Sequence, residues 1–154
     1  MSLSQLLKPD AVLAALRVNG KKQALQEMSE RAALVSGLTA REIFDAILQR
    51  ERLGSTGVGD GVAIPHGKIA KCKSIFGVFA RLDRPIDFEA PDGLPVDLIF
   101  MLIAPEAAGA DHLTALATAA RLLRNGAVAA QLRGARDPAT LYALLTMAPT
   151  SNAA

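Results

Sequence analysis

The sequence predicts a single α/β domain, a three-layer α/β/α sandwich in which helices flank a central β-sheet. Two observations lead to this fold class. The segment Val96–Ala104 is almost entirely apolar, which is typical of a central strand that is covered on both faces. The segments around it carry apolar residues at helical spacing or in short runs, so helices and strands mix along the chain. We expect the domain to span residues 1–148 and residues 149–154 to form a disordered tail.

The beginning of the chain predicts one strand and one long helix. Residues 2–7 fit a single helical turn, and the apolar residues 11–18 precede a turn signal at residues 19–20. The short length of this apolar stretch favours a strand over a helix. Apolar residues then recur at helical spacing in Lys21–Val35, and Gly37 ends the predicted helix.

A second helix is predicted by the signature at its N-terminus. Thr39 and Glu42 have the spacing of a capping box, in which the two side chains accept hydrogen bonds from each other's backbone N–H groups. We expect the helix to run to about Glu51, which places Arg50 in its last turn. Its predicted inner face consists of Ile43, Phe44, Ile47 and Leu48.

Two longer strands are predicted in the middle of the chain. Residues 74–82 alternate small and apolar side chains, which favours a strand. Arg84-Pro85 and the turn signal at residues 91–93 bound a predicted loop. The apolar run Val96–Ala104 is the predicted central strand, and Pro105 closes it.

The last part of the chain predicts three helices. Asp111 is the expected N-cap of the first helix, and Asn125-Gly126 is its expected stop. A short helix follows at residues 127–132, and Asp137-Pro138 begins the last helix with proline at the first helical position. The first of these helices has a predicted inner face of Leu113, Leu116, Ala117, Ala120 and Leu123.

Composition argues against several classes of protein. The net charge is only +2, whereas a protein that binds nucleic acid usually presents a clustered basic face. No apolar run approaches the roughly 20 residues of a membrane span, and the N-terminus lacks the pattern of a signal peptide. The single cysteine cannot form an intramolecular disulfide. We therefore expect a cytoplasmic protein that neither spans a membrane nor binds nucleic acid.

The most distinctive stretch is a glycine-rich loop that leads to a histidine. The four glycines of Gly54–Gly61 indicate tight turns and uncovered backbone amides. The apolar run Val62–Ile64 fits a brief buried strand, and Pro65 fixes the backbone just before His66. Gly67 leaves space beside the histidine. Because imidazole is both a nucleophile and a base near neutral pH, His66 is the candidate reactive group.

Other uses of a histidine fit the remaining residues less well. A zinc site needs three or four ligands, whereas the chain has two histidines and one cysteine with no close ligand pair. The chain has no nucleophile elbow or Cys–His pair, and the loop lacks the Gly-Lys-Ser/Thr ending of a phosphate-binding P-loop. We expect no metal and no cofactor. A histidine that is purely structural stays open as an alternative.

Arg50 and His112 would complete an anion site around His66. Arg50 offers a planar bidentate donor at the loop entrance, although on position alone the helix dipole is the favoured explanation for it. His112 lies in the first turn of a predicted helix, where backbone amides favour an anion. This environment suits formation and breakdown of a phosphohistidine, in which positioning and charge stabilisation dominate. The loop residues assigned to phosphate binding are Gly54, Ser55, Thr56, Gly57 and Gly67.

Two adjacent motifs carry a resemblance to a known family. Gly54–Gly59 is followed by Ala63–Lys68, with further matches at Arg50-Glu51, Pro95–Phe100 and His112-Leu113. These motifs resemble phosphotransferase-system (PTS) IIA proteins of the fructose/mannitol type, also called EIIA type 2, and most of all their nitrogen-regulatory IIA group. The resemblance covers nearly the whole chain, and its most specific part is the Ile-Pro-His-Gly segment with the glycine loop before it.

The resemblance implies a fold and a chemistry. The fold is a mixed β-sheet flanked by helices. The chemistry is that of a phosphoryl carrier, in which His66 accepts a phosphoryl group from a phosphohistidine of HPr or its paralogue NPr. Arg50 and His112 are implied to lie beside it as phosphate-stabilising residues. Asp60 adds a carboxylate to the loop, and we expect it to point into solvent.

A single domain favours a regulatory role, in which the phosphorylation state of His66 controls binding to other proteins. The resemblance implies targets in potassium transport, in nitrogen-related regulation or among sensor kinases, and it leaves a homodimer open. One alternative is a sugar-specific IIA component for fructose or mannitol that passes the phosphoryl group to a separate IIB protein. Another is a protein-binding module whose histidine is not phosphorylated.

Overall fold

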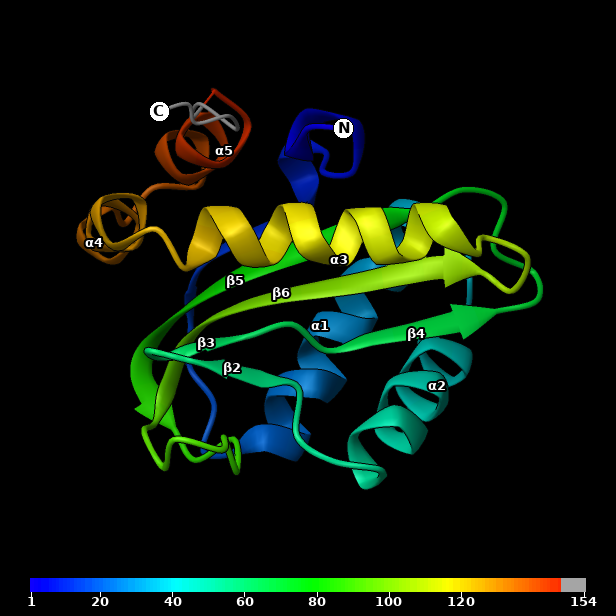
Figure 1. Cartoon of the computed structure of the whole chain (residues 1–154), viewed down its shortest axis with the longest axis horizontal. Coiled ribbons are helices and arrows are strands. Elements are labelled where there is room, and N and C mark those ends of the chain that lie inside the picture. Colours follow the sequence, from blue (N-terminus) through cyan, green and yellow to red (C-terminus); the bar gives the residue numbers. More distant parts are fainter. Residues whose placement is uncertain (148–154) are drawn as a thin grey trace.

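A six-stranded mixed sheet lies between two layers of helices in the computed structural model, which describes residues 1–147 (Figure 1). The predicted tail and the boundary at residue 148 lie outside the described residues. The strands are β1 (Val12–Leu16), β2 (Gly57–Gly59), β3 (Val62–Ala63), β4 (His66–Ile69), β5 (Phe76–Ile86) and β6 (Val96–Pro105).

The sheet is organised around β6. The strand order is β1-β5-β6-β3-β2, and β4 also pairs with β6. β6 runs parallel to β3 and β4 and antiparallel to β5, while β1 is parallel to β5. The side chains of Leu98–Ala104 are completely buried. The predicted central strand and mixed sheet are therefore confirmed.

Helices cover both faces of the sheet. On one face α1 (Lys21–Ser36) and α2 (Ala40–Arg52) pack against each other and contact β5 and β4. On the other face α3 (Ala110–Leu123) crosses β6, in front of the sheet in Figure 1. The shorter elements are α4 (Gly126–Gly134), α5 (Pro138–Met147) and the 3₁₀ turns η1 (Leu3–Gln5) and η2 (Pro9–Ala11). The predicted three-layer sandwich is confirmed.

The capping signals of the first two helices are confirmed. Gly37 ends α1 in the left-handed conformation, with a φ of 82°, which glycine adopts without a steric penalty. The backbone N–H of Glu42 donates to the Thr39 hydroxyl at 3.1 Å, and Glu42 accepts from the Thr39 backbone N–H at 3.4 Å. Ile43 and Ile47 are completely buried on the inner face of α2.

The predicted cap and inner face of α3 are wrong. Gly109 is the N-cap, and Asp111 is exposed in the first turn. Leu113 is 68% exposed and only Leu123 of the predicted face is fully buried. The Thr118 hydroxyl is buried at little cost because it donates to the Thr114 carbonyl at 2.8 Å. The buried side chains are His112, Ala115, Thr118, Ala119, Leu122 and Leu123.

Two predicted boundaries also differ. β5 continues through Arg84-Pro85 to Ile86, where a loop was expected. The proline is tolerated because the pairing register with β6 shifts between Arg81 and Ile86, a place where no regular ladder bond is required. Asn125 does not simply end α3, because its side chain accepts from two backbone N–H groups at the start of α4, at 3.0 and 3.2 Å.

Candidate functional site

His66 is the first residue of strand β4, which sequence reasoning did not predict. The sequence suggested a site built from loop, because His-Gly-Lys-Ile is too short and too polar to indicate a strand. β4 forms because it pairs with β6, with His66 opposite Leu102. Gly67 serves α2 rather than the histidine, since a Cβ there would lie 3.2 Å from the Ala46 Cβ.

The His66 imidazole is held in one tautomer. Its Nδ1 lies 2.9 Å from the Ile64 carbonyl oxygen, which can only accept, so Nδ1 carries the proton. The lone pair is therefore on Nε2. Burial is the main cause and lowers the pKa of His66. The hydrogen bond to Ile64 opposes it in part, and the charges of Arg50 and Glu51 have smaller effects that lower and raise the pKa respectively. The ring is thus a neutral nucleophile at neutral pH.

His112 lies beside His66; the anion-binding role expected for it stays a prediction. It comes from the first turn of α3, and the two ring centroids are 5.4 Å apart. His112 is 6% exposed, and its Nδ1 is buried without a hydrogen-bond partner among residues 1–147. Burial is the main cause that lowers its pKa, with contributions from the charges of His66 and Lys68.

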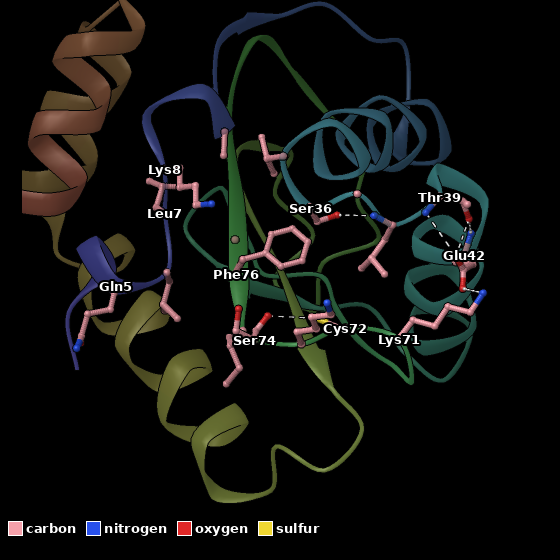
Figure 2. Close-up of a pocket in the computed structure, with 18 of the residues that line it drawn as sticks. Gln5, Leu7, Lys8, Ser36, Thr39, Glu42, Lys71, Cys72, Ser74 and Phe76 are labelled. Carbon is pink, nitrogen blue, oxygen red and sulfur yellow. Dashed lines mark hydrogen bonds and ion pairs between the residues drawn. The ribbon is translucent and has the colours of Figure 1, made fainter.

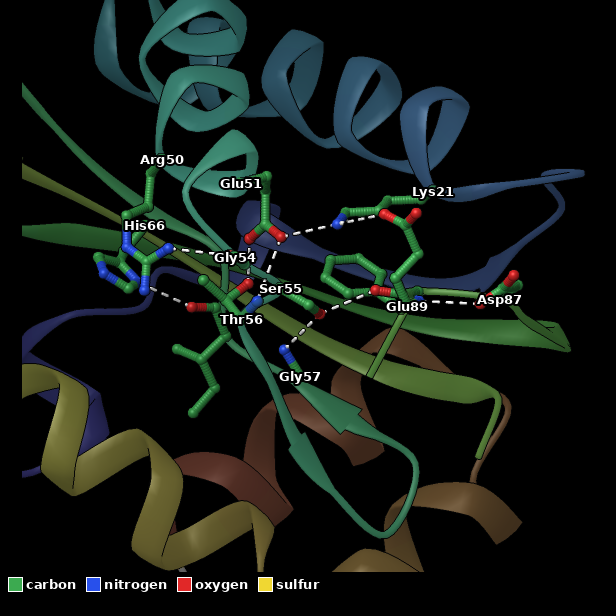
Figure 3. Close-up of polar contacts among 12 residues, drawn as sticks. Lys21, Arg50, Glu51, Gly54, Ser55, Thr56, Gly57, His66, Asp87 and Glu89 are labelled. Atoms are coloured by element: carbon green, nitrogen blue, oxygen red, sulfur yellow. Dashed lines mark hydrogen bonds and ion pairs between the residues drawn. The ribbon is translucent and has the colours of Figure 1, made fainter. Parts of the chain in front are cut away.

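Arg50 also reaches this place from the last turn of α2 (Figure 3). Its Nη1 donates to the Gly54 carbonyl at 2.9 Å, and its guanidinium lies next to the His66 ring in the view. The charge of Arg50 is among the causes that lower the pKa of His66. The structure therefore gathers Arg50, His66 and His112, as predicted.

The loop residues assigned to phosphate binding are engaged within the chain. The Ser55 hydroxyl donates to the Phe88 carbonyl at 2.8 Å and accepts from the Gly57 N–H at 3.1 Å. The Thr56 N–H and hydroxyl both donate to the Glu51 carboxylate. These bonds shape the loop, and its phosphate-binding role stays a prediction. Asp60 is exposed in the turn between β2 and β3, as expected.

Sequence reasoning missed a buried ion pair next to the loop. The Glu51 side chain is 2% exposed, and its carboxylate lies 2.9 Å from Lys21 Nζ. Lys21 also lies 3.3 Å from the exposed Glu89 carboxylate and 4.7 Å from the centroid of the Phe88 ring. One signal could have revealed the pair: a carboxylate in the last turn of a helix opposes the helix dipole, so Glu51 needs another reason to be there.

A pocket of about 690 Å³ lies away from these groups, at the opposite end of α2 (Figure 2). The N-terminal segment, the start of α2 and the loop after β4 line it, and Cys72 in that loop is buried. Burial raises the pKa of the Cys72 thiol, which makes it a poor nucleophile. The pocket adds no reactive group to the site.

Residues 1–147 contain neither a candidate metal-binding cluster nor a candidate membrane-spanning helix. No cluster of three or more histidine, cysteine, aspartate or glutamate side chains there is arranged to hold a metal ion. None of the helices in this range is both long and apolar enough to cross a membrane.

Comparison with known proteins gives consistent matches. The family model described as "Phosphoenolpyruvate-dependent sugar phosphotransferase system, EIIA 2" matches residues 5–148. A nitrogen regulatory protein of Bradyrhizobium diazoefficiens is 57% identical over 153 residues, which cover 99% of this chain and 100% of that protein.

Solved structures agree with these sequence matches. The structure of nitrogen regulatory protein IIA-Ntr from Neisseria meningitidis matches with a TM-score of 0.87 at 36% identity, covering 92% of this chain and 97% of that one. IIA mannitol from Escherichia coli has a TM-score of 0.76 at 19% identity, covering 90% and 98%. The second likeness concerns the fold alone.

Proposed function

The chain belongs to the EIIA 2 family of the phosphoenolpyruvate-dependent sugar phosphotransferase system, and on that premise we propose that it is a phosphoryl carrier that accepts a phosphoryl group on Nε2 of His66. The observation that carries the proposal is the hydrogen bond from Nδ1 of His66 to the Ile64 carbonyl at 2.9 Å. This bond leaves Nε2 as the nucleophilic nitrogen of a neutral ring.

The transfer step follows from this geometry. The Nε2 lone pair attacks the phosphorus of a phosphohistidine on a carrier of the HPr or NPr type. As the new Nε2–P bond forms, the bond between phosphorus and the donor imidazole breaks, and the donor nitrogen takes back the electron pair. Positive charge develops on the His66 ring, and the Nδ1–H bond to the Ile64 carbonyl strengthens because its donor becomes charged.

Arg50 and His112 act on the transferred group. The phosphoryl oxygens carry the negative charge of the transition state, so fixed donors near them lower the barrier. The Arg50 guanidinium donates to the Gly54 carbonyl through Nη1. This bond orients its remaining N–H donors toward the phosphoryl oxygens. His112, buried but close to the His66 ring, supplies a donor from the opposite layer of the fold.

We further propose a regulatory use of the phosphoryl group. The similarity to a nitrogen regulatory protein extends over the full length of both chains, and phosphorylation adds nearly two negative charges at one histidine. Such a change can switch a protein-binding surface. Proteins of potassium transport and sensor kinases are the targets to examine first.

The direct test is phosphorylation of the purified protein by phosphoenolpyruvate, enzyme I and either HPr or NPr. The label should map to His66 by mass spectrometry, should be lost in acid and should persist in base, as expected for a phosphohistidine. Onward transfer to a sugar-specific IIB protein would favour a sugar-uptake role over regulation. A folded protein that takes no label from either donor would instead favour the unphosphorylated binding module.

A further inference from the structure

We propose that Glu51 is a positioning residue for phosphoryl transfer, and that Lys21 is the counter-ion paired with its buried carboxylate. The inference rests on the proposed function of His66 and deepens it. Glu51 does not touch the reacting atoms. It acts on His66 through a continuous series of hydrogen bonds and on Arg50 through the end of α2.

The Glu51 carboxylate contacts two other segments of the chain (Figure 3). The carboxylate accepts from the Thr56 backbone N–H at 3.2 Å, from the Thr56 hydroxyl, and from Lys21 Nζ at 2.9 Å. One side chain therefore joins the end of α2, the glycine loop and the first turn of α1.

Hydrogen bonds lead from Thr56, the partner of Glu51, to the ring of His66. The Thr56 carbonyl accepts from the Ile64 N–H at 3.0 Å, and the Ile64 carbonyl accepts from Nδ1 of His66 at 2.9 Å. The relay therefore runs from Glu51 through Thr56 and Ile64 to His66. Because the Ile64 carbonyl selects the tautomer of His66, any shift of Thr56 changes the direction and basicity of Nε2.

A carboxylate is energetically costly at the position of Glu51. The Glu51 side chain is 2% exposed, and it lies at the negative end of the α2 dipole. Burial and dipole both disfavour the charge, and a buried pair of this kind is often no more stable than apolar residues of similar size. Fold stability is therefore a weak explanation for Glu51, whereas a fixed loop beside His66 is a direct one.

Lys21 makes this arrangement compatible with phosphorylation. The arriving phosphoryl group carries nearly two negative charges, which an uncompensated Glu51 carboxylate would repel. The Lys21 ammonium lies 2.9 Å from the Glu51 carboxylate and over the face of the Phe88 ring, and its side chain is only 16% exposed. It neutralises Glu51 and leaves Arg50 free to meet the phosphoryl oxygens.

The test measures single-turnover transfer from phosphorylated HPr or NPr to wild-type protein, Glu51→Gln, Lys21→Met and the double variant. We expect Glu51→Gln to transfer roughly 10-fold more slowly with an unchanged KM for the donor, as for a misplaced nucleophile. Lys21→Met should be slower still because it leaves the buried carboxylate without its counter-ion. The double variant should recover to the rate of Glu51→Gln, which shows that the two residues act as a pair.

Two matched controls separate positioning from general loss of an ion pair. Glu89→Gln removes the exposed partner of Lys21 and leaves Glu51 in place. Asp97→Asn breaks the ion pair with Arg133, whose Nε lies 3.0 Å from the Asp97 carboxylate. Arg133 also donates to the Asp60 carbonyl in the β2–β3 turn. Both controls should transfer at the wild-type rate, even where Asp97→Asn lowers the free energy of unfolding.

A second readout needs no phosphoryl donor. Nitrogen-15 NMR of the His66 side chain should show a proton on Nδ1 in the wild type and a larger share of the Nε2–H tautomer in Glu51→Gln. Thr56→Val removes the hydroxyl that donates to Glu51 and so weakens the same series of hydrogen bonds. It serves as a second variant if Glu51→Gln does not fold. Lys21→Arg should restore most of the rate that Lys21→Met loses.

The outcomes distinguish the inference from the function on which it rests. Folded Glu51→Gln with the wild-type rate and the wild-type tautomer would overturn the inference while the carrier function stands. Wild-type protein that takes no phosphoryl group would overturn the carrier function, and the tautomer measurement would then decide whether Glu51 positions His66. A slower rate together with a shifted tautomer supports both.

Discussion

The imidazole rings of His66 and His112 lie with their centroids 5.4 Å apart and their planes inclined at 57°. Two cationic rings at this separation would repel each other, and the charge of His66 is one of the causes that lower the pKa of His112. A phosphoryl group on one ring would lie within reach of the other. A change in the charge of one ring therefore changes the protonation of the other.

Stability should fall as the solution becomes mildly acidic. Burial lowers the pKa of both histidines in the folded protein, so the unfolded chain takes up these protons first as the pH drops below about 6.5. We expect the two neutral histidines to contribute fully to the free energy of unfolding above that pH. This contribution should be lost as the pH falls through their pKa values in the folded protein. Urea unfolding between about pH 5 and 8 should show a shallower decline for His66→Gln/His112→Gln; an identical decline would contradict the prediction.

Substitution of His66 should remove the phosphoryl acceptor and keep the fold. His66→Ala loses the hydrogen bond to the Ile64 carbonyl, which costs about 1 kcal/mol of stability. Phosphorylation should be undetectable by mass spectrometry, while circular dichroism stays that of the wild type. Label on another residue of the folded variant would remove His66 from its assigned role.

Arg50 should contribute charge stabilisation rather than structure. We expect Arg50→Ala to slow transfer by roughly 10²-fold or more, as for the loss of one preorganised donor in an active site. Arg52→Ala is the matched control, because Arg52 is basic, lies in the same last turn of α2 and is exposed. Rapid-quench measurement of transfer decides the matter, and similar rates for the two variants would place Arg50 outside the site.

His112→Gln should be milder than His66→Ala. A glutamine amide retains one donor for a phosphoryl oxygen, whereas His112→Ala retains none. The expected order of transfer rates is wild type, His112→Gln and then His112→Ala, measured with the same phosphorylated donor. If His112→Gln is as inactive as His66→Ala, His112 does more than stabilise charge.

Gly67→Ala should weaken the packing of α2 on β4. The new Cβ would lie 3.2 Å from the Ala46 Cβ and 3.3 Å from the Ala46 backbone carbonyl carbon, and such overpacking typically costs about 1–3 kcal/mol. Gly134→Ala, which meets no atom within 4 Å, is the control. Urea unfolding should show a loss only for Gly67→Ala; equal midpoints would mean that α2 moves aside freely.

Much of the fold was visible in the sequence because local signals agreed with the tertiary structure. The capping box at Thr39 and the glycine at position 37 depend on neighbouring residues only, and the apolar run of β6 is long enough to be unambiguous. β2 and β4 were missed because short strands exist through their pairing, which no local pattern encodes. The face of α3 was missed because alanine and leucine occur on most sides of that helix.

The site divides in the same way. The proximity of His66 and His112 could be anticipated from their places after Ile-Pro and at a helix start, whereas the position of Arg50 at a helix end also fits the helix dipole, and its site role remains a prediction. Glu51 and Lys21 were missed because charged residues on amphipathic helices usually face solvent. Only the tertiary structure brings the first turn of α1 to the last turn of α2.

Arg50, His66 and His112 come from three different layers of the molecule: α2, the sheet and α3. Residues 50–66 carry Arg50, the glycine loop and His66 as one contiguous segment, which could be grafted onto another scaffold only if that scaffold offers a strand that pairs as β6 does. His112 belongs to a segment far along the chain and would be left behind. A grafted segment would carry His66 and Arg50, and the new scaffold would have to supply a second imidazole in place of His112.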